Sequence, residues 1–329
     1  MTGWRAHCFV GAAAAAACWF CATAHAAARD STYPDHPVRL VVPAPSGGSV
    51  DVMARLLARQ IETQLGQTIV VDNRGGANGI IGIDIVSKAP PDGYTLLSSA
   101  SVFAINPAMY RKLPYDTEKD FVPIANFANG PGYVFVAHPS VPASTLKELV
   151  ALARDKPLRY GTAGIGNGQH LVGELLNMSA GIQLQHVPYK GGGPAFNAVV
   201  SGEVHVHFAA AITALAHVKA NRLRALGFTG KARLPALPEV PTFVEAGYPG
   251  FVYQTGWHAW FAPARTPPAI VEKLHAEIRR ALNAPQLRDS FLAAGSEPVS
   301  DSRADFAKIL RDDIRRYAEI IRAAKIELQ

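Results

Sequence analysis

Apolar and polar residues alternate along the chain in a pattern that first predicts a strand, a loop and a helix. The apolar run Val38–Val42 predicts a buried strand that ends at Pro43. From Ser49 to Leu65 the apolar residues recur at helical spacing, and Gly66 follows as a stop signal. A short segment of serine and glycine joins the two elements.

The same alternation continues to about residue 230 and predicts an α/β fold. Expected strands lie at 68–71, 94–98, 134–137, 158–161, 185–189, 204–209 and 223–227, with helices at 79–89, 144–155, 168–178 and 194–201. Ser144 is the expected cap of the second of these helices. Strands that alternate with helices predict parallel sheets covered by helices. The restart near residue 134 indicates a second α/β domain.

A tail of helices follows the proline-rich stretch 234–249. The last of them carries one apolar stripe, which predicts that it packs on the first domain; the stripe is Phe306, Ile309, Leu310, Ile314, Tyr317, Ile321 and Ala324.

The first 26 residues have the features of a secretory signal. Arg5 precedes an apolar stretch at 8–23, and Ala24-His25-Ala26 supplies the small residues that a signal peptidase requires. Cleavage after Ala28 and an uncleaved anchor are the alternatives. Cys8, Cys18 and Cys21 all lie in this segment, so the mature chain is expected to be exported and free of cysteine chemistry.

Composition restricts the classes of function. The 329 residues are 49% hydrophobic and 18% charged, which excludes a disordered or coiled-coil chain. The net charge is +6, but the 32 lysines and arginines are scattered rather than clustered. A scattered basic charge argues against a nucleic-acid surface, so the function is expected in a small-molecule site.

The loop Ser46-Gly47-Gly48-Ser49 lies between a strand and the start of a helix. Free backbone N–H groups and the helix dipole favour an anion there, and the alternative is a tight turn in which Ser49 caps the helix. Asp51 in the first helical turn would repel a bound anion unless loop amides occupy its oxygens. We therefore expect Asp51 to orient the loop.

Two more glycine-rich loops precede helix starts in the second half of the chain. The segment 161–170 (GTAGIGNGQH) has neither the dinucleotide-binding nor the P-loop spacing, and the segment 189–194 (YKGGGP) adds Lys190. Loops from both domains that face each other across a cleft would hold a small acid at both ends.

The sequence supports a catalytic or metal site less well than an anion-binding site. No GxSxG or HExxH motif occurs. His205 and His207 share a strand face and would give a metal only two ligands, so buried or edge histidines are the favoured interpretation. His170 and Glu174 have helical spacing and are favoured as a supporting pair rather than a metal clamp.

These segments resemble the exported solute-binding receptors of tripartite tricarboxylate transporters, the Bug or TctC-like family. The similar stretches cover nearly the whole mature chain, from Tyr33-Pro34 to the last helix. They include Pro45-Ser46-Gly47-Gly48-Ser49-Val50-Asp51 with Ala54-Arg55, Asp72-Asn73-Arg74-Gly75-Gly76-Ala77-Asn78-Gly79, Pro91-Asp92-Gly93-Tyr94-Thr95-Leu96-Leu97, the loop 161–171, Val187-Pro188-Tyr189-Lys190-Gly191, Leu237-Pro238-Glu239-Val240-Pro241-Thr242 with Glu245-Ala246-Gly247, and Phe261-Ala262-Pro263.

The resemblance implies a two-lobed periplasmic binding protein fold of type II, in which each lobe is a mixed sheet flanked by helices and strands cross at the hinge. After the signal peptide 1–26, domain I is expected at 36–131 and 251–329, and domain II at 132–250. The expected ligand is a small carboxylate, an organic acid or an amino acid. Its binding residues are expected to be Ser46, Gly47, Gly48, Ser49, Asp51, Asn78, Ser99, Thr162, Ala163, Gly164, Gly166, His170 and Lys190.

The resemblance also implies a periplasmic, monomeric receptor without a cofactor, a metal or a catalytic residue. Its partner would be a membrane permease of the tripartite tricarboxylate type. A membrane sensor is the alternative partner, and a periplasmic enzyme that uses His170 or the pair His205 and His207 is the alternative function. The chain departs from the family at His205 and Ala209, where acidic residues are common.

Overall fold

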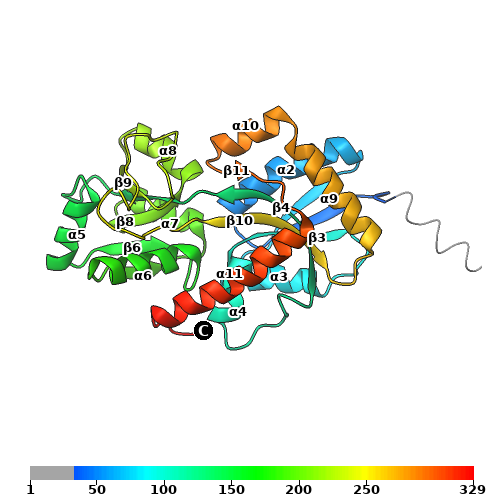
Figure 1. Ribbon diagram of the computed structural model, residues 1–329, viewed down its shortest axis with the longest axis horizontal. Coiled ribbons are helices and arrows are strands. Elements are labelled where there is room, and N and C mark those ends of the chain that lie inside the picture. Colours follow the sequence, from blue (N-terminus) through cyan, green and yellow to red (C-terminus); the bar gives the residue numbers. More distant parts are fainter. Residues whose placement is uncertain (1–32) are drawn as a thin grey trace, which may run out of the picture.

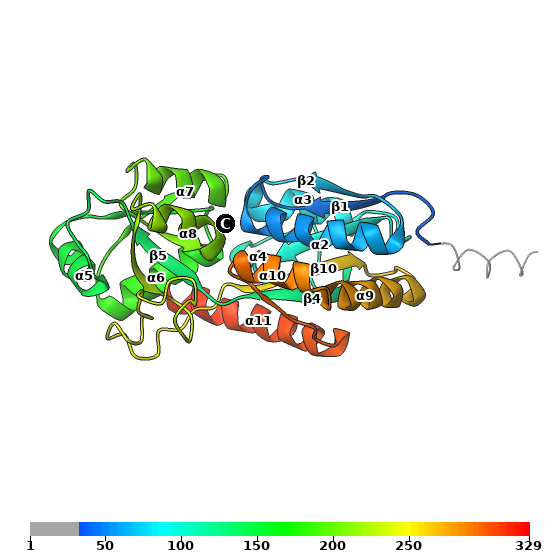
Figure 2. The ribbon, with the colours of Figure 1, turned by 90° about the horizontal axis from the view of Figure 1, so that it is seen from above.

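The computed structural model describes residues 33–329 and contains two lobes, each built on its own sheet (Figure 1). The first residues, with the signal sequence and its cleavage site expected at Ala26, lie outside the described residues. The two lobes lie side by side along the longest axis of the molecule (Figure 2).

Lobe I is built on a six-stranded mixed sheet of order β11-β4-β10-β3-β1-β2. Its parallel part consists of β1 (Val38–Val42), β2 (Ile69–Asn73) and β3 (Thr95–Ala100). The antiparallel strands are β4 (Phe121–Gly130), β10 (Gly256–Pro263) and β11 (Glu297–Pro298). Its helices are α2 (Ser49–Leu65), α3 (Ile80–Ser87), α4 (Val102–Met109), α9 (Pro268–Leu282), α10 (Pro285–Ala293) and α11 (Arg303–Ala323), with a 3-10 turn η1 (Ala77–Gly79).

Lobe II is built on a five-stranded mixed sheet of order β7-β6-β8-β5-β9. The strands are β5 (Tyr133–Ala137), β6 (Arg159–Thr162), β7 (Gln185–Pro188), β8 (Val206–Ala210) and β9 (Arg224–Phe228). The helices are α5 (Leu146–Asp155), α6 (Gly168–Ala180), α7 (Gly192–Val200) and α8 (Ala211–Lys219). The α/β class is confirmed, and both sheets are mixed, as the family resemblance implies. The wholly parallel sheets predicted from the alternation alone are wrong, because β4, β5, β10 and β11 pair antiparallel.

Two segments of the chain cross between the lobes: β4 continues into β5, and the segment 251–255 leads into β10 (Figure 1). Buried Thr229 ties them together. Its Oγ1 accepts a hydrogen bond from the Tyr133 amide at 2.8 Å and donates one to the Tyr253 carbonyl at 2.6 Å. The two crossing segments therefore form one paired hinge.

The last helix packs as its apolar stripe predicts. Phe306, Leu310, Tyr317 and Ile321 of α11 are buried, and the helix lies against α4 and β4 of lobe I. Trp257 and Phe261 of β10 meet Phe306 through ring contacts at centroid distances of 5.2 and 5.8 Å. One apolar core that includes these residues continues into lobe II.

Three details differ from the sequence-based expectations. Thr145, not Ser144, caps α5, because its Oγ1 accepts from the Glu148 amide while the Glu148 carboxylate returns to the Ser144 amide. Gly48, not Ser49, is the N-cap of α2. The strand β4 was not predicted, because its asparagines and Pro123 are typical of a loop; the structure places Pro123 at a register shift opposite Phe261.

None of the helices within residues 33–329 combines the length and the apolar composition needed to cross a bilayer.

Candidate functional site

The N-terminus of α2 presents backbone donors that the helix itself does not use. Gly48 is extended and provides no side-chain cap, and the first helical hydrogen bond runs from the Val52 amide to the Gly48 carbonyl at 3.0 Å. The amides of the first turn, from Ser49 onward, therefore have no acceptor within the helix. Together with the positive end of the helix dipole, they favour an anion at this point.

Asp51 holds the loop that precedes this helix. Its carboxylate accepts hydrogen bonds from the Gly47 amide, from Arg55 Nε and from Asn73 Nδ2, each at 2.9 Å. Burial alone would raise the pKa of Asp51, but these hydrogen bonds hold it below its usual range. The expectation that a loop amide occupies this carboxylate is confirmed, and Asp51 fixes the shape of the loop 44–49.

We expect Asp51→Asn to loosen this loop, because Asp51 is 2% exposed and its charge is compensated by Arg55. Loss of one partner of a buried hydrogen-bonded pair costs about 1–3 kcal/mol, and the free energy of unfolding should fall by that amount. Affinity for the ligand should fall about tenfold, and calorimetry together with thermal unfolding measures both effects.

Asp312→Asn is the matched control, since Asp312 forms exposed ion pairs on α11 that contribute little to stability. Equal losses for the two variants would show that Asp51 has no special role in the loop.

Asn78 and Ser99 complete the predicted residues of lobe I. Asn78 has a left-handed φ of 53°, and its Nδ2 donates to Asn106 Oδ1 at 3.0 Å. Asn106 returns a hydrogen bond to the Asn78 carbonyl at 3.2 Å. Ser99 lies near the end of β3, buried, and its hydroxyl has no partner within the described part of the chain. The strand ends of lobe I therefore hold polar groups in fixed positions.

The glycine loop of lobe II differs from what we expected. The Ala163 amide donates to Gln169 Oε1 at 2.8 Å, the Gly164 amide to Thr162 Oγ1 at 3.3 Å, and the Gly166 amide to His170 Nδ1 at 3.0 Å. The expectation of free amide donors at these three residues is wrong for this arrangement, because neighbouring side chains already occupy them. The amides of Gly168 and Gln169, directly after the loop at the start of α6, have no acceptor within the helix.

His170 of α6 holds the glycine loop of lobe II through a hydrogen bond to its backbone. Because His170 Nδ1 accepts from the Gly166 amide, the proton of the neutral ring is on Nε2, which lies 3.8 Å from Glu174 Oε1. The His170 ring stacks on His186 at a centroid distance of 3.9 Å. Burial lowers the pKa of His170, and burial together with His170 lowers that of His186 to about 3. Both rings are therefore neutral at ordinary pH.

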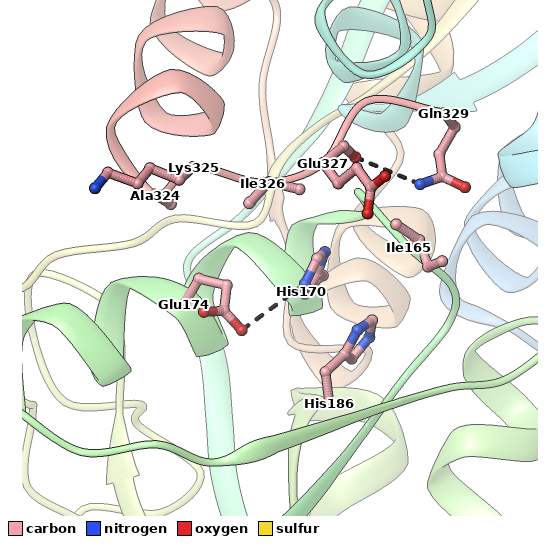
Figure 3. A pocket seen from close by; sticks show the side chains of 9 residues that line it. All are labelled: Ile165, His170, Glu174, His186, Ala324, Lys325, Ile326, Glu327 and Gln329. Atoms are coloured by element: carbon pink, nitrogen blue, oxygen red, sulfur yellow. Dashed lines mark hydrogen bonds and ion pairs between the residues drawn. The ribbon is translucent and has the colours of Figure 1, made fainter.

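These histidines line a cavity of about 280 Å³ (Figure 3). The side chains of His170, Glu174 and His186 face the segment that follows α11, which includes Ile326 and Glu327. The pairing of His170 with Glu174 that the sequence favoured is therefore found, at 3.8 Å between His170 Nε2 and Glu174 Oε1. Both residues line this cavity together with His186.

His205 and His207 have roles inside lobe II. His207 is buried, with Nδ1 2.8 Å from the Gly161 carbonyl, and His205 Nδ1 accepts from the Arg159 amide at 2.9 Å. The interpretation as buried or edge histidines is confirmed. Within residues 33–329 no group of three or more potential ligands that could hold a metal ion is found.

The loops of the two lobes meet at two points. A Cβ on Gly191, in the third glycine loop, would lie 2.7 Å from Pro45 Cγ in the first loop. A Cβ on Gly166 would lie 2.4 Å from Met109 Cγ at the end of α4. Lys190, beside Gly191, is exposed. Facing loops from the two lobes are what the sequence predicted, and the lobes lie close together here.

Several residues that shape the site were not predicted to belong to it. Asn73, Arg55 and Gln169 hold the loops through side-chain hydrogen bonds, and Asn106 positions Asn78. Arg55 and Asn73 lie in segments that carry the family resemblance, so a signal for them was present. Gln169 likewise lies in the loop 161–171 of the resemblance and holds an amide of that same loop. Nothing in the spacing of Asn106 indicates Asn78, which comes from a different element.

Comparisons with known proteins agree with this geometry. Residues 53–326 match the family model described as "Tripartite tricarboxylate transporter family receptor". The chain is 36% identical to the protein BugT of Bordetella pertussis over 316 residues, which cover 94% of this chain and 96% of the relative.

Two solved structures are similar over most of the chain. One is R. palustris Rpa4515 with adipate, with a TM-score of 0.86, 32% identity, and coverage of 90% of this chain and 100% of that chain. The other is MatC from Rhodopseudomonas palustris with bound malate, with a TM-score of 0.81, 31% identity, and coverage of 88% and 100%.

Proposed function

Because the chain belongs to the receptor family of tripartite tricarboxylate transporters, we propose that it captures a small carboxylate, an organic acid or an amino acid, between its two lobes. It is a solute-binding receptor and not an enzyme. The proposed cycle is capture by lobe I and lobe II, closure at the hinge, and delivery of the ligand to a membrane permease of the tripartite tricarboxylate type.

The uncapped start of α2 is the observation that carries this proposal. Its free amides and the helix dipole attract a negative charge. The carboxylate of Asp51 does not oppose that charge, because it accepts a hydrogen bond from the Gly47 amide of the loop. The third glycine loop faces this end across the lobes, at Gly191 and Pro45. A carboxylate bound at the start of α2 would be held by neutral amide donors, with the exposed Lys190 of the third loop nearby.

The chemistry of two similar proteins supports the same class of ligand. Adipate and malate, bound by Rpa4515 and MatC, are both small carboxylates. In this chain the proposed ligand-contacting residues, all expected from the sequence, are Ser46, Gly47, Gly48, Ser49, Asn78, Ser99, Thr162, His170 and Lys190. Ala163, Gly164 and Gly166, whose amides are occupied by neighbouring side chains, are proposed to shape the loop of lobe II. Asp51 is proposed to act through the loop rather than by contact.

We further propose that the receptor is exported to the periplasm as a monomer. Arg5, the apolar stretch 8–23 and the Ala24-His25-Ala26 motif support a signal peptide cleaved near Ala26.

A thermal-shift screen of organic acids and amino acids on the purified protein tests the ligand class. A ligand at 100 times its Kd should add about 2.7 kcal/mol to the free energy of unfolding, which raises Tm by several degrees. A response to sugars or cations without a response to any acid would contradict the proposal.

A further inference from the structure

The segment that follows α11, residues 324–329, is held at both ends by lobe I. At its start the Ile326 amide donates to the Ile321 carbonyl of α11 at 3.1 Å, which closes the end of the helix. At its far end the Gln329 amide donates to the Met109 carbonyl, at the end of α4, at 2.8 Å. This C-terminal segment is therefore a fixed part of lobe I, although it lies beside α6 of lobe II.

The cavity of about 280 Å³ shown in Figure 3 separates the C-terminal segment from lobe II. Within residues 33–329 no hydrogen bond or ion pair joins the segment to lobe II. The two lobes therefore face each other here across a gap that polar side chains line. The lobe II wall consists of Ile165, His170, Glu174 and His186, and the lobe I wall of Ala324, Lys325, Ile326, Glu327 and Gln329.

His170 brings a donor without an acceptor to the lobe II wall. Its Nδ1 accepts from the Gly166 amide at 3.0 Å, so the proton of the neutral ring is on Nε2. The carboxylate of Glu174, one turn along α6, lies 3.8 Å from this nitrogen, which is longer than a hydrogen bond. The same Glu174 oxygen already accepts from the Tyr160 hydroxyl at 2.6 Å. His170 is only 7% exposed, so its N–H depends on the cavity for a partner.

Glu327 brings a carboxylate to the opposite wall. Its side chain is exposed and forms no hydrogen bond or ion pair with any residue from 33 to 329. Figure 3 shows Glu327 on the side of Ile165 and His170, whereas the side chain of Lys325 extends away from them. A negatively charged acceptor of lobe I therefore lies across the cavity from an N–H donor of lobe II.

The same residues connect this cavity with the glycine loop of lobe II. His170 Nδ1 holds the Gly166 amide, and a Cβ on Gly166 would lie 2.4 Å from Met109 Cγ. The Met109 carbonyl in turn holds Gln329 of the C-terminal segment. Because these contacts surround the cavity, a movement of the lobes that narrows it brings Glu327 toward His170.

We propose that Glu327 is a latch between the lobes: its carboxylate accepts a hydrogen bond from His170 Nε2 when the lobes draw together around a ligand. This inference rests on the proposed function, since the latch acts through the loop that is proposed to shape the site of lobe II. The latch touches no ligand. It stabilises the ligand-bound arrangement by a charge-assisted hydrogen bond and so increases affinity for every ligand of the site.

Calorimetry with an acid found in the thermal-shift screen tests the latch. Glu327→Ala should weaken binding about threefold to tenfold, as expected for a partly exposed hydrogen bond to a charged group. Glu327→Gln keeps an oxygen that accepts but loses the charge, so its loss should be smaller. Glu319→Ala, at an exposed glutamate of α11, is the matched control and should leave the affinity unchanged.

A double-mutant cycle with His170→Asn separates the latch from a general effect of the C-terminal segment. The asparagine oxygen replaces Nδ1 as acceptor for the Gly166 amide, but the Nε2 donor is lost. Glu327→Ala should therefore cause no further loss of affinity in the His170→Asn background. NMR of the histidine side chains gives a second measurement: the Nε2 proton signal of His170 should shift on addition of the ligand in the wild type and not in Glu327→Ala.

Wild-type affinity in Glu327→Ala, or an equal loss in the His170→Asn background, would overturn the latch while the proposed function stands. A His170 signal that responds to the ligand identically in Glu327→Ala and in the wild type would do the same. A wild-type protein that binds no acid would overturn the proposed function together with the latch.

Discussion

Replacing Gly166 by valine is expected to reduce ligand affinity about a hundredfold or more. A Cβ at this position would lie 2.4 Å from Cγ and 2.6 Å from Sδ of Met109, which is fully buried in the opposite lobe. The backbone φ of 74° also disfavours a β-branched residue. The clash and the strain together should cost the arrangement in which Gly166 lies against Met109 about 3 kcal/mol, which corresponds to that loss of affinity.

Calorimetry with an acid found in the screen measures the affinity, and small-angle scattering should show a larger radius of gyration for the variant. Gly181→Val is the matched control. Gly181 has a φ of 59°, but a Cβ there meets nothing within 4 Å, so the variant carries the backbone strain without the contact between lobes. If Gly166→Val binds as tightly as the control, the approach of Gly166 to Met109 is not required for binding.

Acid is expected to begin to destabilise the protein near pH 6.5, before its carboxylates titrate. Burial lowers the pKa of His207 and of His258 to about 4 each, and burial with the neighbouring His170 lowers that of His186 to about 3. In the unfolded chain these histidines bind protons near pH 6.5. Between pH 6.5 and about pH 4 the unfolded chain therefore holds more protons than the folded protein.

The free energy of unfolding should accordingly fall as the pH is lowered through this window, and the contribution of His186 should continue to fall to about pH 3. His207 alone accounts for about 3 kcal/mol, at 1.36 kcal/mol for each unit of pKa shift. Several buried histidines together approach the ordinary stability of a protein, so acid unfolding is expected near pH 4.

Denaturant titrations at several pH values measure this slope. His207→Asn keeps a donor toward the Gly161 carbonyl and removes the titrating ring, so its slope should be shallower than that of the wild type. A wild-type stability that stays constant from pH 6.5 to pH 4 would contradict the assignment of neutral buried histidines.

Local sequence patterns were sufficient to predict a helix or strand whose own residues specify it. The helix from Ser49 to Leu65 was predicted with its correct bounds, because its apolar face has helical spacing and Gly66 adopts the left-handed cap that glycine favours. The crossing strand β4 was not predicted, because Pro123 and several asparagines are tolerated there only through its pairing with β10.

The same division holds within the site. The role of Asp51 followed from its place in the first turn of α2, where a free carboxylate would oppose the helix dipole. The amides of Ala163, Gly164 and Gly166 were expected to be free, but Gln169, Thr162 and His170 occupy them. Which side chain accepts a hydrogen bond from which loop amide depends on the folded arrangement, and the spacing of the glycines does not predict it.

The sequence alone determined the α/β class, the alternating elements, the family and the anion-favouring start of α2, because each of these depends on residues that are neighbours in the chain. Only the tertiary structure decided which polar groups remain unpaired, such as the Tyr253 hydroxyl, which lies beside Gly168 although the two residues are far apart in the sequence. The same is true of Gly166 and Met109, which belong to different lobes and lie against each other in the folded protein.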